Sequence, residues 1–215
     1  MFAAKLLGWV LLGLVRLLTG AQARWWGCPP KAEQRIYFAN HQSHLDLVMI
    51  WAALPEELRS ITRPIAARDY WANTPMKRWI TTEVFHAIYV ERGGTPAPAE
   101  DGGSPPDPMA PLQPLIEALE SGDSIIIFPE GTRGHTGEPQ KFKSGLFTLA
   151  QMFPDVVLVP AWIDNVQRVM PKGEIVPVPI LCSVTFGAPI TLAPGEERRA
   201  FLDRARDAVM ALRHV

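Results

Sequence analysis

Short apolar runs that alternate with helical segments are the feature that most constrains the fold of this chain. "RIYFAN" (Arg35–Asn40), "SIIIF" (Ser124–Phe128) and "VVLVPAWI" (Val156–Ile163) are too short for helices and have the apolar character of strands buried on both faces. Segments with helical patterns lie between them, for example Ser43–Leu54 and Leu112–Gly122. This alternation predicts an α/β fold with a mixed, largely parallel sheet flanked by helices.

The remaining patterned segments fit the same architecture. Further strands are expected at Arg59–Ala67, Ala87–Val90 and Leu181–Phe186. Further helices are expected at Pro75–Phe85, Lys141–Phe153 and Gly195–Arg213. The stretch 93–111 contains Gly, Pro and small polar residues without an aromatic, which predicts a flexible loop inside one domain that spans residues 31–215.

Length and composition exclude several classes of protein. The chain has 215 residues, of which 47% are hydrophobic and 20% charged, as expected for a folded domain with a real core. Its formal net charge of −1 gives no indication of a nucleic-acid partner. Cys28 and Cys182 are far apart and lack C-x-x-C spacing, so neither a disulfide framework nor a zinc cluster is expected.

Residues 1–30 predict a helical segment that anchors the protein to a membrane. A helix over Ala3–Leu18 would be about 24 Å long, which is short of a hydrocarbon core of about 30 Å. Lys5 and Arg16 would share one narrow stripe of an otherwise apolar helix, as in helices that lie in the membrane interface.

Two other interpretations of this segment remain open. The small residues of "AQA" (Ala21–Ala23) resemble the cleavage site of a secretory signal, and an apolar helix of this length also suits a protein core. In the anchored arrangement, Arg24, Trp25 and Trp26 would lie at the level of the lipid headgroups.

Three polar clusters follow three of the predicted strands. They are "NHQSHLD" (Asn40–Asp46), "ERGG" (Glu91–Gly94) and "PEGTRG" (Pro129–Gly134). In parallel sheets, ligands bind outside the carboxyl ends of the strands, and those ends meet at one edge. The three clusters therefore predict a single site.

The first cluster has two compatible interpretations. Ser43 and Asp46 have the spacing of a capping box, with Ser43 as the helix N-cap. His41 would precede that helix in non-helical backbone, from which its ring can fold back to the Asp46 carboxylate. A carboxylate on one imidazole nitrogen fixes the tautomer, so the other nitrogen can act as a general base. His44 is expected to face solvent or pack on the helix.

The third cluster suits a phosphate group. Gly131 allows a turn with exposed backbone N–H groups, Thr132 adds a hydroxyl, and Arg133 adds a forked cation. Arg92 in the second cluster would add another cation. An ion pair between Glu130 and Arg133 on the surface is the alternative. No metal site is expected, because further ligands at defined spacing are lacking.

These motifs resemble those of glycerolipid acyltransferases, the 1-acylglycerol-3-phosphate acyltransferase family. "NHQSHLD" is similar to the N-H-x-S-x-x-D block of that family, and "FPEGTR" matches its third block. "IYVERGG", "KFKSG" (Lys141–Gly145) and "VLVPAWI" resemble its other conserved segments more weakly. The resemblance covers roughly residues 35–163. His86 and Ala87 stand where a glycine is common in the family.

The resemblance implies a direct acyl transfer without a cofactor or metal. His41 would be the base and Asp46 its partner, and the sn-2 hydroxyl of lysophosphatidate would attack the thioester of acyl-CoA or acyl-carrier protein. The residues implied for holding the substrate phosphate are Arg92, Glu130, Gly131, Thr132 and Arg133. Family members act at the cytoplasmic face of the cell membrane, so the bilayer is an expected partner.

Three alternative functions remain open at this stage. The chain could acylate another lyso-lipid, such as a lyso-aminolipid. It could be a lipid-binding protein of the same fold without catalytic activity. It could also be a hydrolase of the thioesterase type, in which water replaces the acceptor.

Overall fold

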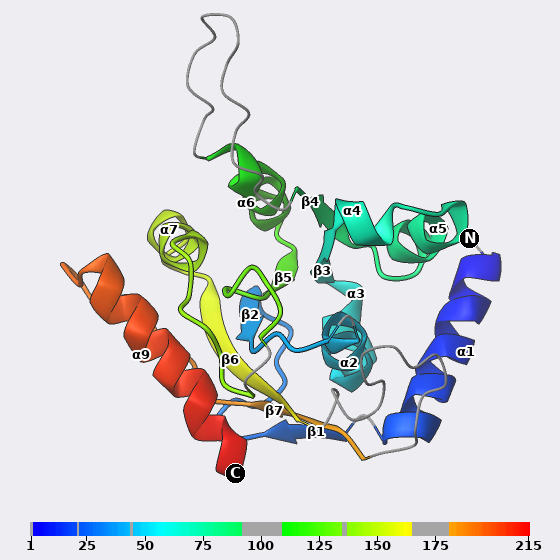
Figure 1. Ribbon diagram of the computed structural model, residues 1–215, viewed down its shortest axis with the longest axis horizontal. Helices are drawn as coiled ribbons and strands as arrows, with labels where there is room; N and C mark the ends of the chain where they lie inside the picture. The colour runs from blue at the N-terminus through cyan, green and yellow to red at the C-terminus, as the bar shows by residue number, and fades with distance from the viewer. Residues whose placement is uncertain (1, 21, 44, 92–108, 135–136, 165–180) are drawn as a thin grey trace, which may run out of the picture.

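Strand β2 (Arg35–Ala39) lies near the centre of a seven-stranded sheet, and all five of its residues are buried. The computed structural model describes residues 2–20, 22–43, 45–91, 109–134, 137–164 and 181–215. The strands follow the order β1-β7-β6-β2-β5-β3-β4 across the sheet (Figure 1). The other strands are β1 (Gln22–Trp25), β3 (Thr62–Ala67), β4 (Ile88–Val90), β5 (Ser124–Ile127), β6 (Val157–Asp164) and β7 (Ser183–Phe186).

The sheet is mixed and mostly parallel, as the sequence predicted. β2 pairs in parallel with both β5 and β6, and β3 pairs in parallel with both β5 and β4. The exception is β7, which runs antiparallel to β6. Strand β1 pairs in parallel with β7 and forms the edge of the sheet. The carboxyl ends of β2 and β5 therefore lie side by side, which brings the first and third polar clusters together.

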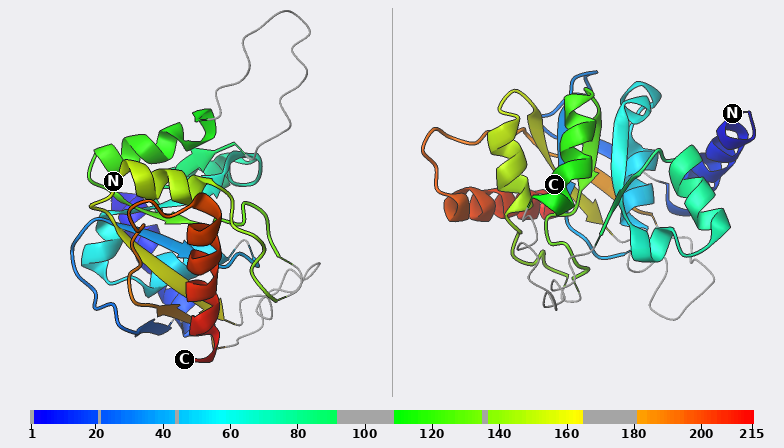
Figure 2. Two further views of the ribbon diagram at one scale, coloured as in Figure 1. Left: turned by 90° about the vertical axis from the view of Figure 1, so that its left-hand side faces the viewer. Right: turned by 90° about the horizontal axis from the view of Figure 1, so that it is seen from above.

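Helices cover both faces of the sheet, which explains the apolar character of its central strands. Helices α1 and α2 pack on one face and α6, α7 and α9 on the other (Figures 1 and 2). The described helices are α1 (Phe2–Thr19), α2 (Asp46–Ala53), α3 (Glu56–Ser60), α4 (Arg68–Trp71), α5 (Pro75–Glu83), α6 (Gln113–Glu120), α7 (Gly145–Met152) and α9 (Arg198–Ala211), with 3₁₀ turns at Ala110–Leu112 and Leu212–His214.

Helix α1 packs on α2 through one side and leaves the other side exposed. Leu12 is buried in the core, and the Arg16 guanidinium donates to the Ala52 carbonyl near the C-terminus of α2. Arg16 is still exposed overall, and its guanidinium lies where the carbonyl end of a helix attracts a cation. None of the described helices is long and apolar enough to cross a membrane.

The short strand β1 was not anticipated. Residues 22–25 belong to the segment 1–30 that was expected to be helical, but they pair with β7 at the edge of the sheet. Trp25 stacks on Phe186 with ring centroids 4.2 Å apart, and Trp26 is exposed; their expected place at headgroup level stays a prediction. The helical part of the segment ends at Thr19. Its membrane role stays a prediction.

Several further segments depart from the expected boundaries; for example, the strand expected at Arg59–Ala67 begins only at Thr62, after helix α3. Helix α2 begins at Asp46, three residues after the predicted start at Ser43. Of the predicted loop 93–111, residues 93–108 lie outside the described residues, and the final residues enter the 3₁₀ turn Ala110–Leu112. Arg92 and His44 also lie outside the described residues, so their expected roles stay predictions.

Candidate active site

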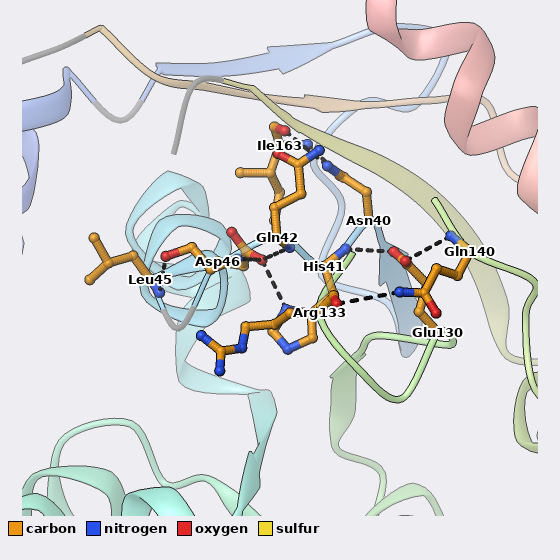
Figure 3. Close-up of polar contacts among 10 residues, drawn as sticks. Asn40, His41, Gln42, Leu45, Asp46, Glu130, Arg133, Gln140 and Ile163 are labelled. Carbon is orange, nitrogen blue, oxygen red and sulfur yellow. Dashed lines mark hydrogen bonds and ion pairs between the residues drawn. The ribbon is translucent and has the colours of Figure 1, made fainter. Parts of the chain in front are cut away.

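His41 and Asp46 form the predicted pair at the carboxyl end of β2. The distance from His41 Nδ1 to Asp46 Oδ2 is 2.9 Å (Figure 3). The pairing depends on the late start of α2, because residues five apart in a continuous helix point in different directions. With Nδ1 on the carboxylate, Nε2 is the nitrogen left to exchange a proton with another molecule.

Asp46 also organises the backbone that carries His41. The same carboxylate oxygen accepts the backbone N–H groups of Gln42 at 2.6 Å and Ser43 at 2.7 Å. The Ser43 hydroxyl in turn accepts the Leu45 N–H at 3.2 Å. One half of the predicted capping box is therefore formed, the bond from the Ser43 N–H to the Asp46 carboxylate, whereas the Ser43 hydroxyl bonds to Leu45 instead of Asp46 and the helix N-cap is Leu45 instead of Ser43. Asp46 is only 1% exposed, so its position is fixed by the fold.

Asn40 fastens the end of β2 to the end of β6. Its amide donates to the Ile163 carbonyl at 3.0 Å and accepts the Ile163 N–H at 2.8 Å. Asn40 is buried, so this pair of bonds satisfies groups that would otherwise lack water. The role of Asn40 could not be predicted from the motif, because its partner Ile163 is distant in the chain.

Glu130 holds the backbone around His41. One carboxylate oxygen accepts the His41 N–H at 2.7 Å and the other accepts the Gln140 N–H at 2.8 Å (Figure 3). Burial raises the pKa of Glu130, and the two backbone N–H bonds act in the opposite direction. In the structure Glu130 thus supports the backbone of the site, and the prediction that it helps to hold substrate phosphate stays a prediction.

The turn that follows Glu130 presents two exposed polar side chains, those of Thr132 and Arg133. Gly131 has a φ of +69°, a conformation that glycine adopts without strain. The Arg133 carbonyl accepts from the Gln140 amide, while its guanidinium forms no ion pair with a described residue (Figure 3). The alternative ion pair between Glu130 and Arg133 is thus not formed. The predicted contacts of these residues with phosphate stay predictions.

A largely apolar cavity of about 400 Å³ opens beside His41. The His41 ring stacks on Phe128 with centroids 4.4 Å apart, and both side chains line the cavity. Its apolar walls come from both layers and include Leu47, Ile65, Trp71, Leu115 and Leu146. A cavity of this size and character suits a ligand with a hydrocarbon chain.

The residues around this cavity meet the requirements of a base-assisted transfer. A histidine with a fixed tautomer lies beside an apolar cavity, with exposed cationic and hydroxyl side chains on the neighbouring turn. Among the described residues, no group of three or more His, Cys, Asp or Glu side chains is placed to bind a metal ion.

Comparisons with known proteins agree with this geometry. The acyltransferase family profile matches residues 29–164. The chain is 30% identical over 148 residues to the 1-acyl-sn-glycerol-3-phosphate acyltransferase alpha of Bos taurus, which covers 67% of this chain and 45% of that protein. It is 28% identical over 189 residues to the human protein of the same name, covering 85% of this chain and 60% of that protein. The chain spans about half the length of these curated relatives.

A solved structure shows the same fold. The crystal structure of the 1-acyl-sn-glycerophosphate acyltransferase of Thermotoga maritima aligns with a TM-score of 0.66 at 20% sequence identity. The alignment covers 99% of this chain and 80% of that chain. Because the family profile covers more than half of the chain and includes the His41–Asp46 pair, this protein belongs to the acyltransferase family.

Proposed function

We propose that the chain transfers a fatty acyl group from a thioester to the sn-2 hydroxyl of 1-acylglycerol-3-phosphate, giving phosphatidate in phospholipid synthesis. The donor is acyl-CoA or acyl-carrier protein. The observation that carries the proposal is the 2.9 Å contact between His41 and Asp46 beside an apolar cavity. The names of the relatives supply the acceptor class.

The geometry supports a direct transfer with His41 as base. The Asp46 carboxylate accepts a hydrogen bond from the Nδ1–H group, so Nε2 is free to take the proton of the acceptor hydroxyl as the hydroxyl oxygen attacks the thioester carbonyl. A C–O bond forms, and the C–S bond breaks as the tetrahedral intermediate collapses. The imidazolium gives the proton to the leaving thiolate. Asp46 stabilises the imidazolium between the two transfers, so no cofactor is needed.

Activity assays with a panel of acceptors test this proposal. Purified protein is incubated with labelled acyl-CoA and either lysophosphatidate, a lyso-aminolipid or no lipid. We expect acylated lysophosphatidate from the wild type and a rate about 10²–10⁴ lower from His41→Ala. His214→Ala is the matched control, since His214 is an exposed histidine near the C-terminus.

The other outcomes of this assay separate the alternatives. Free fatty acid without acylated lipid would identify a hydrolase, and acylation of the lyso-aminolipid alone would identify a different acceptor. Lipid binding without turnover would identify a non-catalytic protein. Full activity of His41→Ala would exclude His41 as the base.

We also propose that the protein associates with the cytoplasmic face of the cell membrane through α1. The side of α1 that faces away from α2 exposes large apolar side chains, among them Trp9 at 62% and Leu17 at 82%. An exposed apolar helix face of this kind is typical of helices that lie in the membrane interface.

Co-sedimentation with phospholipid vesicles tests this association. Trp9→Glu combined with Leu17→Glu should reduce the bound fraction without lowering thermal stability, because both side chains are exposed. Met152→Glu is the matched control, since Met152 is an exposed apolar residue on α7, at the opposite end of the molecule (Figure 2). Equal loss of binding in both variants would exclude α1 as the membrane contact.

A further inference from the structure

Lys143 lies in the wall of the cavity that contains His41. It ends the connection between β5 and α7, and its backbone N–H donates to the Pro129 carbonyl at 2.9 Å. A Cβ placed on Gly131 would lie 2.6 Å from Lys143 Nζ and 2.8 Å from its Cε. The side chain therefore lies directly over the Gly131 backbone, which fixes its course along the cavity wall.

The Lys143 ammonium lacks a counter-charge among the described residues around the cavity. Glu91 also lines the cavity, but it pairs with Arg68 at 2.8 Å. Glu130 and Asp46 lie close by in the fold, and their hydrogen bonds go to the His41 ring and to backbone N–H groups. The cavity thus combines apolar walls with one cation that has no protein partner in the described part of the chain.

We propose that Lys143 binds the phosphate of the acceptor and thereby makes the enzyme prefer lysophosphatidate to an uncharged monoacylglycerol. This inference rests on the proposed function. Lys143 belongs to the "KFKSG" segment that resembles a conserved segment of the family, but it is not among the residues that the resemblance implies for holding the phosphate. A cation beside the base suits an anionic headgroup, because a charge-assisted hydrogen bond to phosphate is stronger than a neutral one.

The position of Lys143 favours the phosphate of the acceptor over those of the donor. In lysophosphatidate the phosphate is separated from the sn-2 hydroxyl by only a few bonds, so it must lie near the base. In acyl-CoA the phosphates are separated from the thioester by the whole pantetheine arm. A cation that shares a cavity wall with His41 is therefore placed to reach the first group and not the second.

Steady-state kinetics of Lys143→Met test the proposal. Methionine keeps the length and the apolar stem over Gly131 but removes the charge. We expect the ratio of kcat/KM for lysophosphatidate to that for monoacylglycerol to fall at least about tenfold, the loss typical of one charge-assisted bond. The KM for acyl-CoA should not change, and Lys143→Arg should retain most of the preference.

Lys141→Met is the matched control. Lys141 is an exposed lysine two residues away and does not line the cavity, so its replacement should leave the preference unchanged. Equal acceptor preference in Lys143→Met and Lys141→Met would overturn the proposal. A rise in the KM for acyl-CoA with unchanged acceptor preference would also overturn it, because it would assign Lys143 to the donor.

Calorimetric titration separates a failure of this inference from a failure of the proposed function. If the wild type acylates no acceptor, the proposed function fails, but binding of lysophosphatidate and of monoacylglycerol is still measurable. A preference for lysophosphatidate that disappears in Lys143→Met would support the lysine as the phosphate contact. A preference that persists in Lys143→Met would overturn it.

Discussion

One carboxylate oxygen of Asp46 has two roles. It accepts a hydrogen bond from the His41 ring, and it also accepts hydrogen bonds from the backbone N–H groups of Gln42 and Ser43. Substitution by asparagine keeps an acceptor for these groups and removes the negative charge. We expect Asp46→Asn to lower kcat about 10²–10⁴-fold. The free energy of unfolding should fall by roughly 1 kcal/mol, since charge-assisted bonds become neutral ones.

Paired measurements of activity and chemical denaturation check this prediction. His41→Ala should lose activity with little change in stability, because the His41 side chain is partly exposed and Asp46 keeps its backbone partners. Asp46→Asn should lose both. Wild-type kcat in Asp46→Asn would show that the charge does not assist the base.

Glu130 gives the protein a pH-dependent contribution to stability. Because burial raises its pKa above the ordinary value of 4.5, the folded state binds the proton more tightly than the unfolded state. This contribution is fully present below the ordinary carboxyl range and is lost as pH rises through the raised folded pKa. Glu130→Gln cannot titrate, so its free energy of unfolding should lack this decline.

Denaturant titrations of both proteins between about pH 4 and pH 7 check the slope. A glutamine side chain has one acceptor oxygen, whereas the backbone N–H groups of His41 and Gln140 each bond to a separate oxygen of Glu130. One of the two N–H groups would lose its partner, so Glu130→Gln should be less stable at every pH by about 1–3 kcal/mol. An identical pH slope in the two proteins would contradict the assignment to Glu130.

At the scale of elements, the turn between β5 and α7 brings Gly131 against Lys143. Gly131→Ala should cost about 1–2 kcal/mol, because alanine is strained at a φ of +69°. It should also displace the Lys143 ammonium, since the new Cβ would lie 2.6 Å from it. We therefore expect a higher KM for lysophosphatidate in addition to the loss of stability.

Gly122→Ala is the control for the strain alone. Gly122 has a φ of +84°, and no atom lies within 4 Å of a Cβ placed there. It should therefore lose stability with an unchanged KM. A double-mutant cycle with Lys143→Met completes the test, because the effect of Gly131→Ala on KM should shrink once the ammonium is gone. Additive effects on KM would show that the two residues act independently.

Elements with a strong local pattern were predictable, and those made by distant contacts were not. The apolar runs of β2 and β5 predicted buried strands, and the structure confirms both. Strand β1 has only four residues, including an arginine, and it exists because it pairs with β7, far along the chain. The motif spacing likewise predicted the contact between His41 and Asp46.

The supporting contacts of the site were hidden from the sequence for the same reason. Asn40 bonds to Ile163, and Glu130 bonds to the backbone of His41, across separations of 123 and 89 residues. The motif alone suggests that Glu130, close to Arg133, binds a ligand. In the folded chain the Glu130 carboxylate is buried and bonds to the backbone of His41. Only the topology of the whole sheet shows which polar residues face the cavity.

At the scale of the whole molecule, the two cysteines report whether the N-terminal elements stay docked on the domain. Both are buried thiols in the same core, and the Cys182 backbone bonds to Thr19 and Gln22 on either side of the connection from α1 to β1. Burial raises the pKa of Cys28, and it raises the pKa of Cys182 to about 11, where Asp164 adds to the effect. Both thiols should therefore react slowly with a thiol reagent near neutral pH.

We expect Cys28 and Cys182 to be labelled only through global unfolding, because α1, β1 and β7 share one core with α2. Labelling followed by mass spectrometry, over a series of denaturant concentrations, gives a protection free energy for each thiol. The two values should equal the free energy of unfolding measured by fluorescence. Protection of Cys182 well below that value would show that α1 and β1 detach from the edge of the sheet while the rest stays folded. The N-terminal elements would then be a separately opening unit rather than part of the single domain.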